Sequence, residues 1–425
     1  MTPEQVKVVP GGEPGLASNS YFRVGAIDRA MALLDETSAV GFEAHVVVEG
    51  AVDEEALAEA WRRLAARHPI LTCVRVGDSW QPSALPLMGP DVGQPRHEAP
   101  PIALRLTAIE GGLLLTLLCN HVAFDGVASR LLLGDLRDEY NAVLEGVDAR
   151  PTDWSPRTVE SVVTEATGWR AMTTALLRGA SAWWQSPVST HLDPGPITTT
   201  PSTGHSLIEL GPVLEALAPA RRRYHWSTDA VLVGVLEHAW ATVFGPPSGE
   251  TSWLVAQDLR PALRVGRGMG NLSVIAGVSI AQPGSDILSV IDRVNVAIDT
   301  QTHDLITAAT ALRRGFSTHP VFGRMLGRSI RYRHYRSVSN VGQLGDSLDR
   351  WGSASAKRVW FVGPLAHPPF TSFIAAGRGS STLVSVRTSP HWLTSEHAAA
   401  LESAAMELVQ VSAPDRTKPD NVPPS

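Results

Sequence analysis

The residues best suited to chemistry lie in segment 120–126, whose sequence is NHVAFDG. Histidine can take up a proton near neutral pH, because its unperturbed pKa is about 6.5. Asp125 follows His121 by four residues, so its carboxylate could orient the ring, hold the loop or cap the next helix. Gly126 allows a backbone turn that a side chain would obstruct. The spacing predicts a proton-transfer site, although a histidine packed in the core at a strand end would give the same pattern.

A predicted strand and a predicted helix flank this segment. Apolar residues fill 113–119, and Gly111-Gly112 joins them to another apolar run at 102–110, which predicts a β-hairpin. After Gly126, apolar residues recur at helical spacing. They are Val127, Leu131, Leu132, Leu136 and Tyr140. Catalytic groups often lie on such connections, because rigid elements hold them on both sides.

Strands and helices alternate through the rest of the chain. Asp53 is a predicted N-cap, and Pro69 ends the helix that follows it, because proline lacks an N–H donor. Further strands are expected at 42–48, 70–76, 253–256, 273–280 and 383–386, and further helices at 27–34, 228–243, 286–312 and 395–411. This mixture predicts an α/β or mixed α+β class.

The composition limits the classes of function. The chain has 425 residues, of which 44% are hydrophobic, and its formal net charge is −6, so non-specific nucleic-acid binding is not expected. Cys73 and Cys119 lie in apolar runs, which predicts buried free thiols in a reducing compartment. The first residues lack a signal-peptide pattern, and no apolar run reaches the roughly 18–20 residues of a membrane span. We therefore expect a cytoplasmic protein.

Several common catalytic and binding motifs are absent from the sequence. It has no Gly-x-Ser-x-Gly nucleophile elbow, no His-Glu-x-x-His pair and no Cys-x-x-Cys pair, so no metal site is expected. Gly266, Gly268 and Gly270 fit neither phosphate-binding pattern, and we expect a loop there.

The NHVAFDG segment resembles the His-His-x-x-x-Asp-Gly motif of the condensation-domain and chloramphenicol-acetyltransferase superfamily. That group includes condensation domains of peptide synthetases and stand-alone polyketide-associated acyltransferases. Four other segments agree with the family pattern and come in the right order. They are RRLAARHPIL at 62–71, DLRP at 258–261, MGN at 269–271 and SNVG at 339–342. The resemblance covers roughly residues 20–412.

The resemblance implies two similar subdomains arranged as a V, each a mixed sheet covered by helices. It places the motif histidine at their junction, midway along a solvent tunnel. Residues 186–205 are rich in proline and poor in apolar residues, which is typical of a linker. We therefore expect a loose leader over 1–18, subdomains over 19–185 and 206–412, and a flexible tail over 413–425.

The family's chemistry is acyl transfer from a phosphopantetheine thioester to an amine or hydroxyl. By resemblance, His121 is the general base, and Asp125 pairs with Arg260 to support it. Asn340, beside Ser339, either polarises the thioester carbonyl, lines the tunnel or serves as a turn residue before a glycine. No permanently bound cofactor is expected. The donor is an acyl thioester of coenzyme A or of an acyl or peptidyl carrier protein, and the acceptor is a small molecule.

Asn120 departs from the family motif, because it stands where the first histidine is expected. Asparagine cannot act as a base, but it donates and accepts hydrogen bonds. Two other functions remain open. One is a catalytically inactive binding module that recruits a carrier protein or a tailoring enzyme. The other is a cyclase that uses the same base.

A run of arginines precedes the SNVG segment. Its members are Arg324, Arg328, Arg331, Arg333 and Arg336. Such a run could dock an acidic carrier protein or the phosphates of coenzyme A. An ordinary solvated basic helix has the same appearance.

Overall fold

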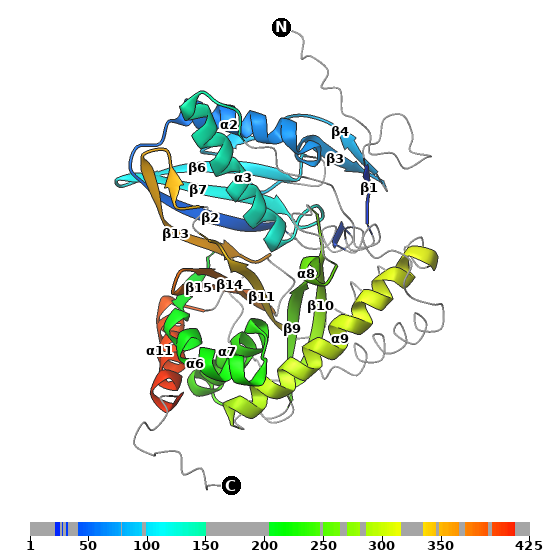
Figure 1. Ribbon diagram of the computed structural model, residues 1–425, viewed down its shortest axis with the longest axis vertical. Helices are drawn as coiled ribbons and strands as arrows, with labels where there is room; N and C mark the ends of the chain where they lie inside the picture. Colours follow the sequence, from blue (N-terminus) through cyan, green and yellow to red (C-terminus); the bar gives the residue numbers. More distant parts are fainter. Residues whose placement is uncertain are drawn as a thin grey trace, which may run out of the picture.

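The fold is taken from a computed structural model of the chain. It describes residues 22–25, 28, 31–32, 41–77, 79–95, 99–149, 204–246, 250–263, 270–280, 286–315, 335–345, 348–364, 370–389 and 393–412. Within these residues, two six-stranded sheets and one three-stranded sheet pack with helices in a mixed α+β arrangement (Figure 1).

The first six-stranded sheet has the order β12-β13-β2-β7-β6-β5. Its strands are β12 (Arg350–Trp351), β13 (Ala354–Val362), β2 (Gly41–Glu49), β7 (Gly112–Asn120), β6 (Ile102–Ile109) and β5 (Met88–Gly89). Helices α2 (Glu54–Arg67) and α3 (Gly126–Glu145) pack over it (Figure 1). Phe42, Ala44, Val46 and Val48 alternate along β2 and are buried in the same core as residues of both helices.

Local signals define the start and end of α2. The Asp53 carboxylate accepts from the Ala56 N–H at 2.9 Å, as predicted for an N-cap. Pro69 begins the 3₁₀ helix η1 (Pro69–Thr72), and β3 (Cys73–Val76) follows. The predicted strand over 70–76 was therefore too long at its start, because the proline fixes a helical φ in the turn before it. β3 forms the three-stranded sheet with β4 (Ser79–Pro82) and β1 (Phe22–Arg23).

The hairpin of β6 and β7 is confirmed, with eight antiparallel partner positions from Ile102–Cys119 to Ile109–Gly112. Gly111 turns the chain at φ 73°, in the left-handed region that favours glycine. β7 is central in the sheet, between β2 and β6, so the end of β7 is held on both sides.

The second six-stranded sheet has the order β10-β9-β11-β14-β15-β8. Its strands are β10 (Ser273–Ile280), β9 (Thr251–Asp258), β11 (Tyr335–Gln343), β14 (Phe370–Arg378), β15 (Ser381–Ser389) and β8 (Ser206–Glu209). The helices are α6 (Gly211–Tyr224), α7 (Thr228–Phe244), the short α8 (Arg260–Leu263), α9 (Ile287–Gly315) and α11 (Ser395–Ser412). Four of them, α6, α7, α9 and α11, share one apolar core with the strands. The predicted helices over 228–243, 286–312 and 395–411 are confirmed within a few residues.

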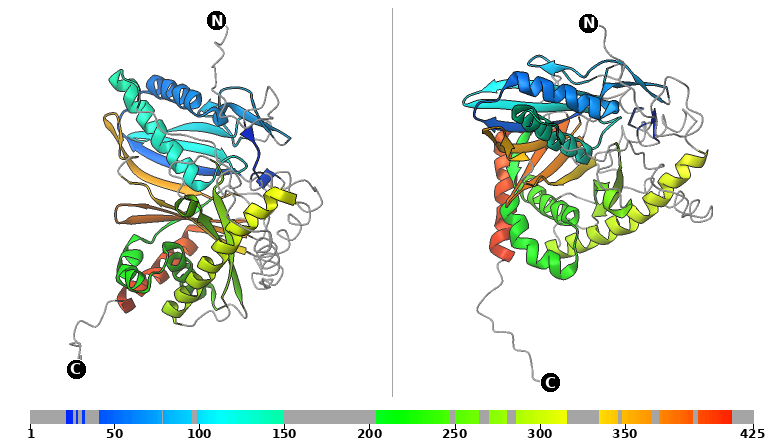
Figure 2. Two further views of the ribbon diagram at one scale, coloured as in Figure 1. Left: turned by 45° about the vertical axis from the view of Figure 1, so that its right-hand side comes forward. Right: turned by 45° about the horizontal axis from the view of Figure 1, so that its top comes forward.

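The two halves of the chain interlock, because β12 and β13 come from the later half but complete the first sheet. β13 pairs antiparallel with β2 from Ser355–Glu49 to Val362–Glu43. Figure 2 shows β13 in orange beside the blue β2. The predicted leader, the tail and all but the last two residues of the 186–205 linker lie outside the described residues.

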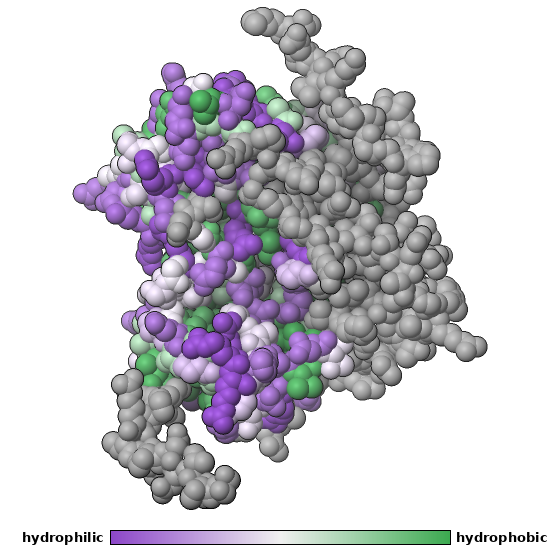
Figure 3. Space-filling model, in the orientation of Figure 1, coloured by the Kyte–Doolittle hydropathy of each residue, from purple (hydrophilic) through white to green (hydrophobic). Residues whose placement is uncertain are grey.

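The described surface is mixed in character. Figure 3 shows mostly hydrophilic colours over both subdomains on that face, with small scattered hydrophobic patches. None of the helices in the described ranges is long and apolar enough to cross a membrane.

Candidate active site

His121 is the first residue after β7, at the start of the loop that leads into α3. The neighbouring Asn120 shapes this loop. Its side-chain oxygen accepts from the Val122 N–H at 2.9 Å, and its backbone oxygen accepts from the Ala123 N–H at 3.1 Å. Asn120 is buried, so its amide serves the turn itself.

The His121 ring is half-buried and is held on two sides. Its Nδ1 lies 3.3 Å from the Asn271 side-chain oxygen. The ring meets Phe42 edge-on, with centroids 5.2 Å apart. Its other nitrogen, Nε2, makes no hydrogen bond to any residue that the structure describes. One ring nitrogen therefore faces the protein, and the other has no partner within the described ranges.

The Asp125 carboxylate is buried and contacts groups other than the His121 ring. It caps α3, because it accepts from the Ala128 N–H at 2.8 Å. Each of its oxygens also accepts from Arg260, at 3.0 Å in both cases. It further accepts from the Leu272 N–H at 2.8 Å and from the Ser273 hydroxyl at 3.0 Å. Asp125 therefore holds the loop and does not orient the ring directly.

Electrostatics keep this buried pair ionised. Burial alone would raise the pKa of Asp125, but the Arg260 charge and the N–H donors lower it below its ordinary value of 3.8. Burial likewise opposes the charge on Arg260, and the carboxylates of Asp125 and Asp258 raise its pKa overall. Arg260 also donates to Asp258 at 2.8 Å and to the Gly270 carbonyl at 3.0 Å. This fork joins the start of α3 to the second subdomain.

Gly126 lies where α3 approaches β11. A Cβ on Gly126 would come within 3.1 Å of a Val341 methyl carbon, and the φ of Gly126 is not positive. A side chain would therefore be obstructed here, and close packing rather than an unusual backbone angle favours glycine.

Asn340 and Ser339 lie on β11, apart from the histidine. The Asn340 amide donates to Asp229 at 2.9 Å and accepts from the Gly342 N–H at 2.9 Å, where the register of β11 shifts. Gln257 donates to the other oxygen of Asp229 at 2.8 Å. Burial raises the pKa of Asp229, and the two amide donors oppose that rise. Among the described residues, no hydrogen bond joins Asn340 or Ser339 to His121.

The arginine run is only partly described. Arg324, Arg328, Arg331 and Arg333 lie outside the described residues. Arg336 is buried, donates to Glu237 at 2.7 Å and lies 4.6 Å from the Trp240 ring centroid. The inclusion of Arg336 in a solvated basic run was therefore wrong, because its charge is neutralised within the second core.

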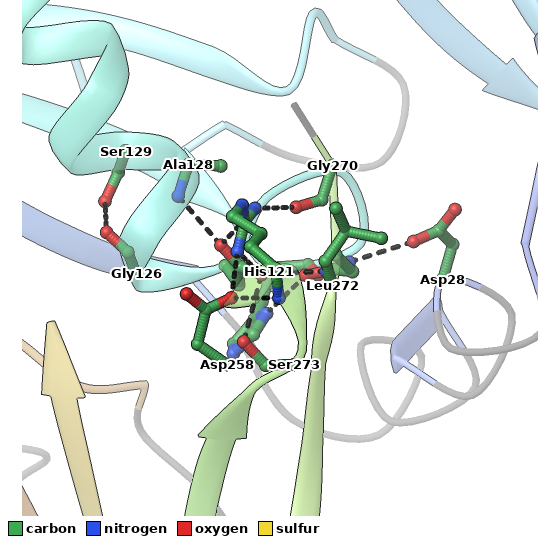
Figure 4. Close-up of polar contacts among 12 residues, drawn as sticks. Asp28, His121, Gly126, Ala128, Ser129, Asp258, Gly270, Leu272 and Ser273 are labelled. Carbon is green, nitrogen blue, oxygen red and sulfur yellow. Dashed lines mark hydrogen bonds and ion pairs between the residues drawn. The ribbon is translucent and has the colours of Figure 1, made fainter. Parts of the chain in front are cut away.

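Asn271 contacts the histidine loop and Asp28, and no role is predicted for either residue from the sequence. The Asn271 amide nitrogen lies 2.6 Å from the His121 carbonyl oxygen, 3.1 Å from that of Val122 and 3.0 Å from Asp28. Figure 4 shows Asp28 reaching toward the loop from the N-terminal segment. Only the Gly-Asn pair at 270–271 offered a sequence signal, and Asp28 offered none.

The described residues contain no cluster of three or more His, Cys, Asp or Glu side chains able to hold a metal ion. Both cysteines are free and buried, as predicted. Burial raises the pKa of the Cys73 thiol to about 12 and raises that of Cys119 as well. Neither thiol is therefore a nucleophile at neutral pH.

No protein-family model and no curated protein matches this sequence. Solved structures do match it over nearly its whole length. The first condensation domain of the calcium-dependent antibiotic synthetase superposes with a TM-score of 0.67 at 15% identity, covering 94% of this chain and 97% of the other. The chain has the condensation-domain fold.

Two further structures share this fold. Polyketide synthase associated protein 5 from Mycobacterium tuberculosis has a TM-score of 0.65 at 16% identity, covering 93% of this chain and 99% of its own. The epimerization domain from the third module of tyrocidine synthetase B has a TM-score of 0.61 at 14% identity, covering 94% and 98%. The predicted two-subdomain fold is confirmed, and because these proteins differ in activity, the reaction has to be argued from the site.

Proposed function

We propose that this protein is an acyltransferase that moves an acyl group from a phosphopantetheine thioester to a hydroxyl or amine in specialised metabolism. The observation that carries the proposal is the state of His121. One ring nitrogen is hydrogen-bonded to the protein, and Nε2 has no partner among the described residues. A half-buried histidine held in this way is suited to act as a general base.

In the proposed reaction, His121 Nε2 takes the proton of the acceptor O–H or N–H as the oxygen or nitrogen attacks the thioester carbonyl carbon. The resulting tetrahedral intermediate expels sulfur when the C–S bond breaks. The imidazolium then returns its proton to the thiolate, so the products are an ester or amide and a free thiol. No covalent bond to the protein forms. The donor is the co-substrate, as free coenzyme A or on a carrier protein.

The surrounding residues support this chemistry indirectly. Asp125 and Arg260 keep the loop at the subdomain junction. Asn340 already uses both ends of its amide within the protein, which favours a role in shaping the tunnel wall beside Ser339 over polarising the carbonyl. Docking of a carrier protein or coenzyme A on Arg324, Arg328, Arg331 and Arg333 is part of the same proposal.

The test is turnover of the purified protein with acyl thioesters and a panel of alcohols and amines. Thiol release and product mass are both measured. The protein's own two thiols are buried and protonated, so a thiol-reactive dye reports the released thiol. We expect His121→Ala to lower turnover by about 100-fold or more. His238→Ala, a half-buried histidine on α7, is the matched control and should retain activity. Full activity in His121→Ala would disprove the proposal.

One alternative reaction would use the same base. The fold also occurs in an epimerization domain, so the same base could act on a tethered substrate, as in a cyclisation. Product mass discriminates, because cyclisation by loss of water needs no external acceptor. Tight binding of a carrier protein without any turnover would instead indicate a module that recruits other proteins. Asn120 at the first motif position is compatible with such a module.

A further inference from the structure

The orientation of the Asn271 side chain is fixed by its surroundings. Its nitrogen end faces three oxygen acceptors, namely the carbonyls of His121 and Val122 and the carboxylate of Asp28. Rotating the amide by 180° would place its oxygen against all three. Asn271 is 3% exposed, so water could not relieve that repulsion. The nitrogen end must therefore face the loop and Asp28, and the oxygen end must face the His121 ring.

This orientation determines which ring nitrogen of His121 carries the proton. The Asn271 oxygen can only accept a hydrogen bond, so the Nδ1 atom 3.3 Å away must donate. A neutral imidazole with its hydrogen on Nδ1 has its lone pair on Nε2. The distance is long for an N–H···O bond, but no competing acceptor for Nδ1 is present among the described residues.

Asp28 strengthens this arrangement from a third part of the chain. It accepts from the Asn271 amide at 3.0 Å and from the Gly25 N–H at 2.9 Å, and it is 8% exposed. A buried carboxylate that holds an amide by its N–H makes the amide oxygen a better acceptor at the other end. Asp28, Asn271 and His121 thus form a series of hydrogen-bonded groups in which each group orients the next.

We infer that Asn271 is a positioning residue that holds His121 in the Nδ1–H tautomer, with Asp28 fixing the amide that does so. The inference rests on the proposed function for its catalytic meaning, because the lone pair on Nε2 is then the base toward the acceptor. Its structural content, the tautomer itself, is independent of any reaction.

The tautomer can be measured without a substrate. Full-length protein with ¹⁵N-labelled histidine is recorded by long-range ¹H–¹⁵N correlation at a pH where the ring is neutral. His121→Gln identifies the signal among the 14 histidines. We expect a protonated-type shift at Nδ1 and an unprotonated-type shift at Nε2. The opposite tautomer, or an even mixture, in the wild-type protein overturns the inference.

Variants then test whether Asn271 is the cause. Asn271→Ala should convert the His121 signal to a tautomer mixture and lower kcat by about 10- to 100-fold, with KM little changed. The matched control is Asn141→Ala. Asn141 also links two elements through both ends of its amide, on α3 and near β12, but it does not contact His121. It should leave the tautomer and kcat unchanged. A loss of kcat in Asn271→Ala without a change of tautomer would indicate a merely structural role and reject the inference.

If Asn271→Ala does not fold, Asp28→Ala provides the second variant, because it removes one acceptor of the amide and leaves Asn271 in place. Asp28→Ala should also give a tautomer mixture at His121 and a lower kcat, and both changes should be smaller than in Asn271→Ala. The two proposals fail separately. A protein without turnover but with the Nδ1–H tautomer would reject the acyltransferase proposal and leave this inference intact. An active protein with the Nε2–H tautomer would reject this inference and the assignment of Nε2 as the base, while acyl transfer itself would stand.

Discussion

At the scale of single residues, the buried Asp125 carboxylate accepts hydrogen bonds from several parts of the protein. It caps α3, accepts both arms of the Arg260 fork and accepts from the Leu272 N–H. A carboxylate in such surroundings is stable only while its cation is present, because an unpaired buried charge is costly. The loop that carries His121 therefore depends on a residue 135 positions later in the chain.

Arg260→Ala should lower the free energy of unfolding by about 3–5 kcal/mol, because it leaves Asp125 buried without its cation. Arg260→Lys keeps the charge but loses the two-armed geometry, so it should cost less. Chemical denaturation at neutral pH measures both. Since the pKa of Asp125 is lowered by folding, its stabilising effect is present above 3.8 and is lost as the pH falls through its folded value. The difference between wild type and Arg260→Ala should therefore shrink on acidification.

Arg378 provides the control for this prediction. It pairs with Asp349 at 2.6 Å, but the two side chains are 27% and 40% exposed. Solvent screens such a pair, so Arg378→Ala should cost only about 0–1 kcal/mol. Equal losses in the two alanine variants would show that the Asp125 pair is not special.

At the scale of elements, β11 carries a register shift where it lies against α3. The register of β11 against β14 shifts between Asn340 and Gly342, and Gly342 adopts a φ of 87°. The next residue, Gln343, accepts a hydrogen bond from Arg130 of α3 at 2.8 Å. The bulge therefore sets one contact between the subdomains.

Gly342→Ala should destabilise the protein more than Gly379→Ala. Both glycines have positive φ, which costs a residue with a Cβ about 1–2 kcal/mol. A Cβ at Gly342 would also lie 2.9 Å from the Arg130 guanidinium, whereas Gly379 has open space around it. Thermal unfolding of both variants measures the difference. Equal shifts in Tm would mean that Arg130 moves away at no cost.

Elements with strong local signals could be predicted from the sequence. The Asp53 cap, the Gly111 turn and the spacing after Gly126 are local patterns, and they predicted α2, the β6–β7 hairpin and α3. β13 could not be placed in the same way, because its partner β2 lies about 300 residues earlier and no local pattern encodes such a pairing.

Part of the candidate site could also be predicted from the sequence. His121, Asp125 and Arg260 were singled out through an ordered set of short motifs, and the structure brings Asp125 and Arg260 together. The contacts of Asn271 depend on the packing of three distant segments. Asp28 belongs to no motif, so only the folded structure could connect it with the histidine.

At the scale of the whole molecule, the subdomains depend on one another because β12 and β13, from the later half of the chain, belong to the first sheet. Trp351 of β12 is fully buried in the first core, 5.9 Å from the Tyr140 ring. Without β12 and β13, the edge of β2 would be left unpaired, and the first core would lose this tryptophan. We therefore expect the two halves to stay associated without the covalent link between them.

A protease site inserted within 186–203, in the predicted linker, should leave the cleaved protein in one piece. The β13–β2 ladder and the Arg260–Asp125 pair each join residues of one fragment to residues of the other. The two fragments should therefore co-elute in size-exclusion chromatography and unfold in one transition. Separation should require denaturant. The same site inserted within 413–425 is the control, because cleavage there removes only a short terminal peptide. If the fragments of the linker variant separate in native buffer, the subdomains are independent units, and the shared strands contribute little to their association.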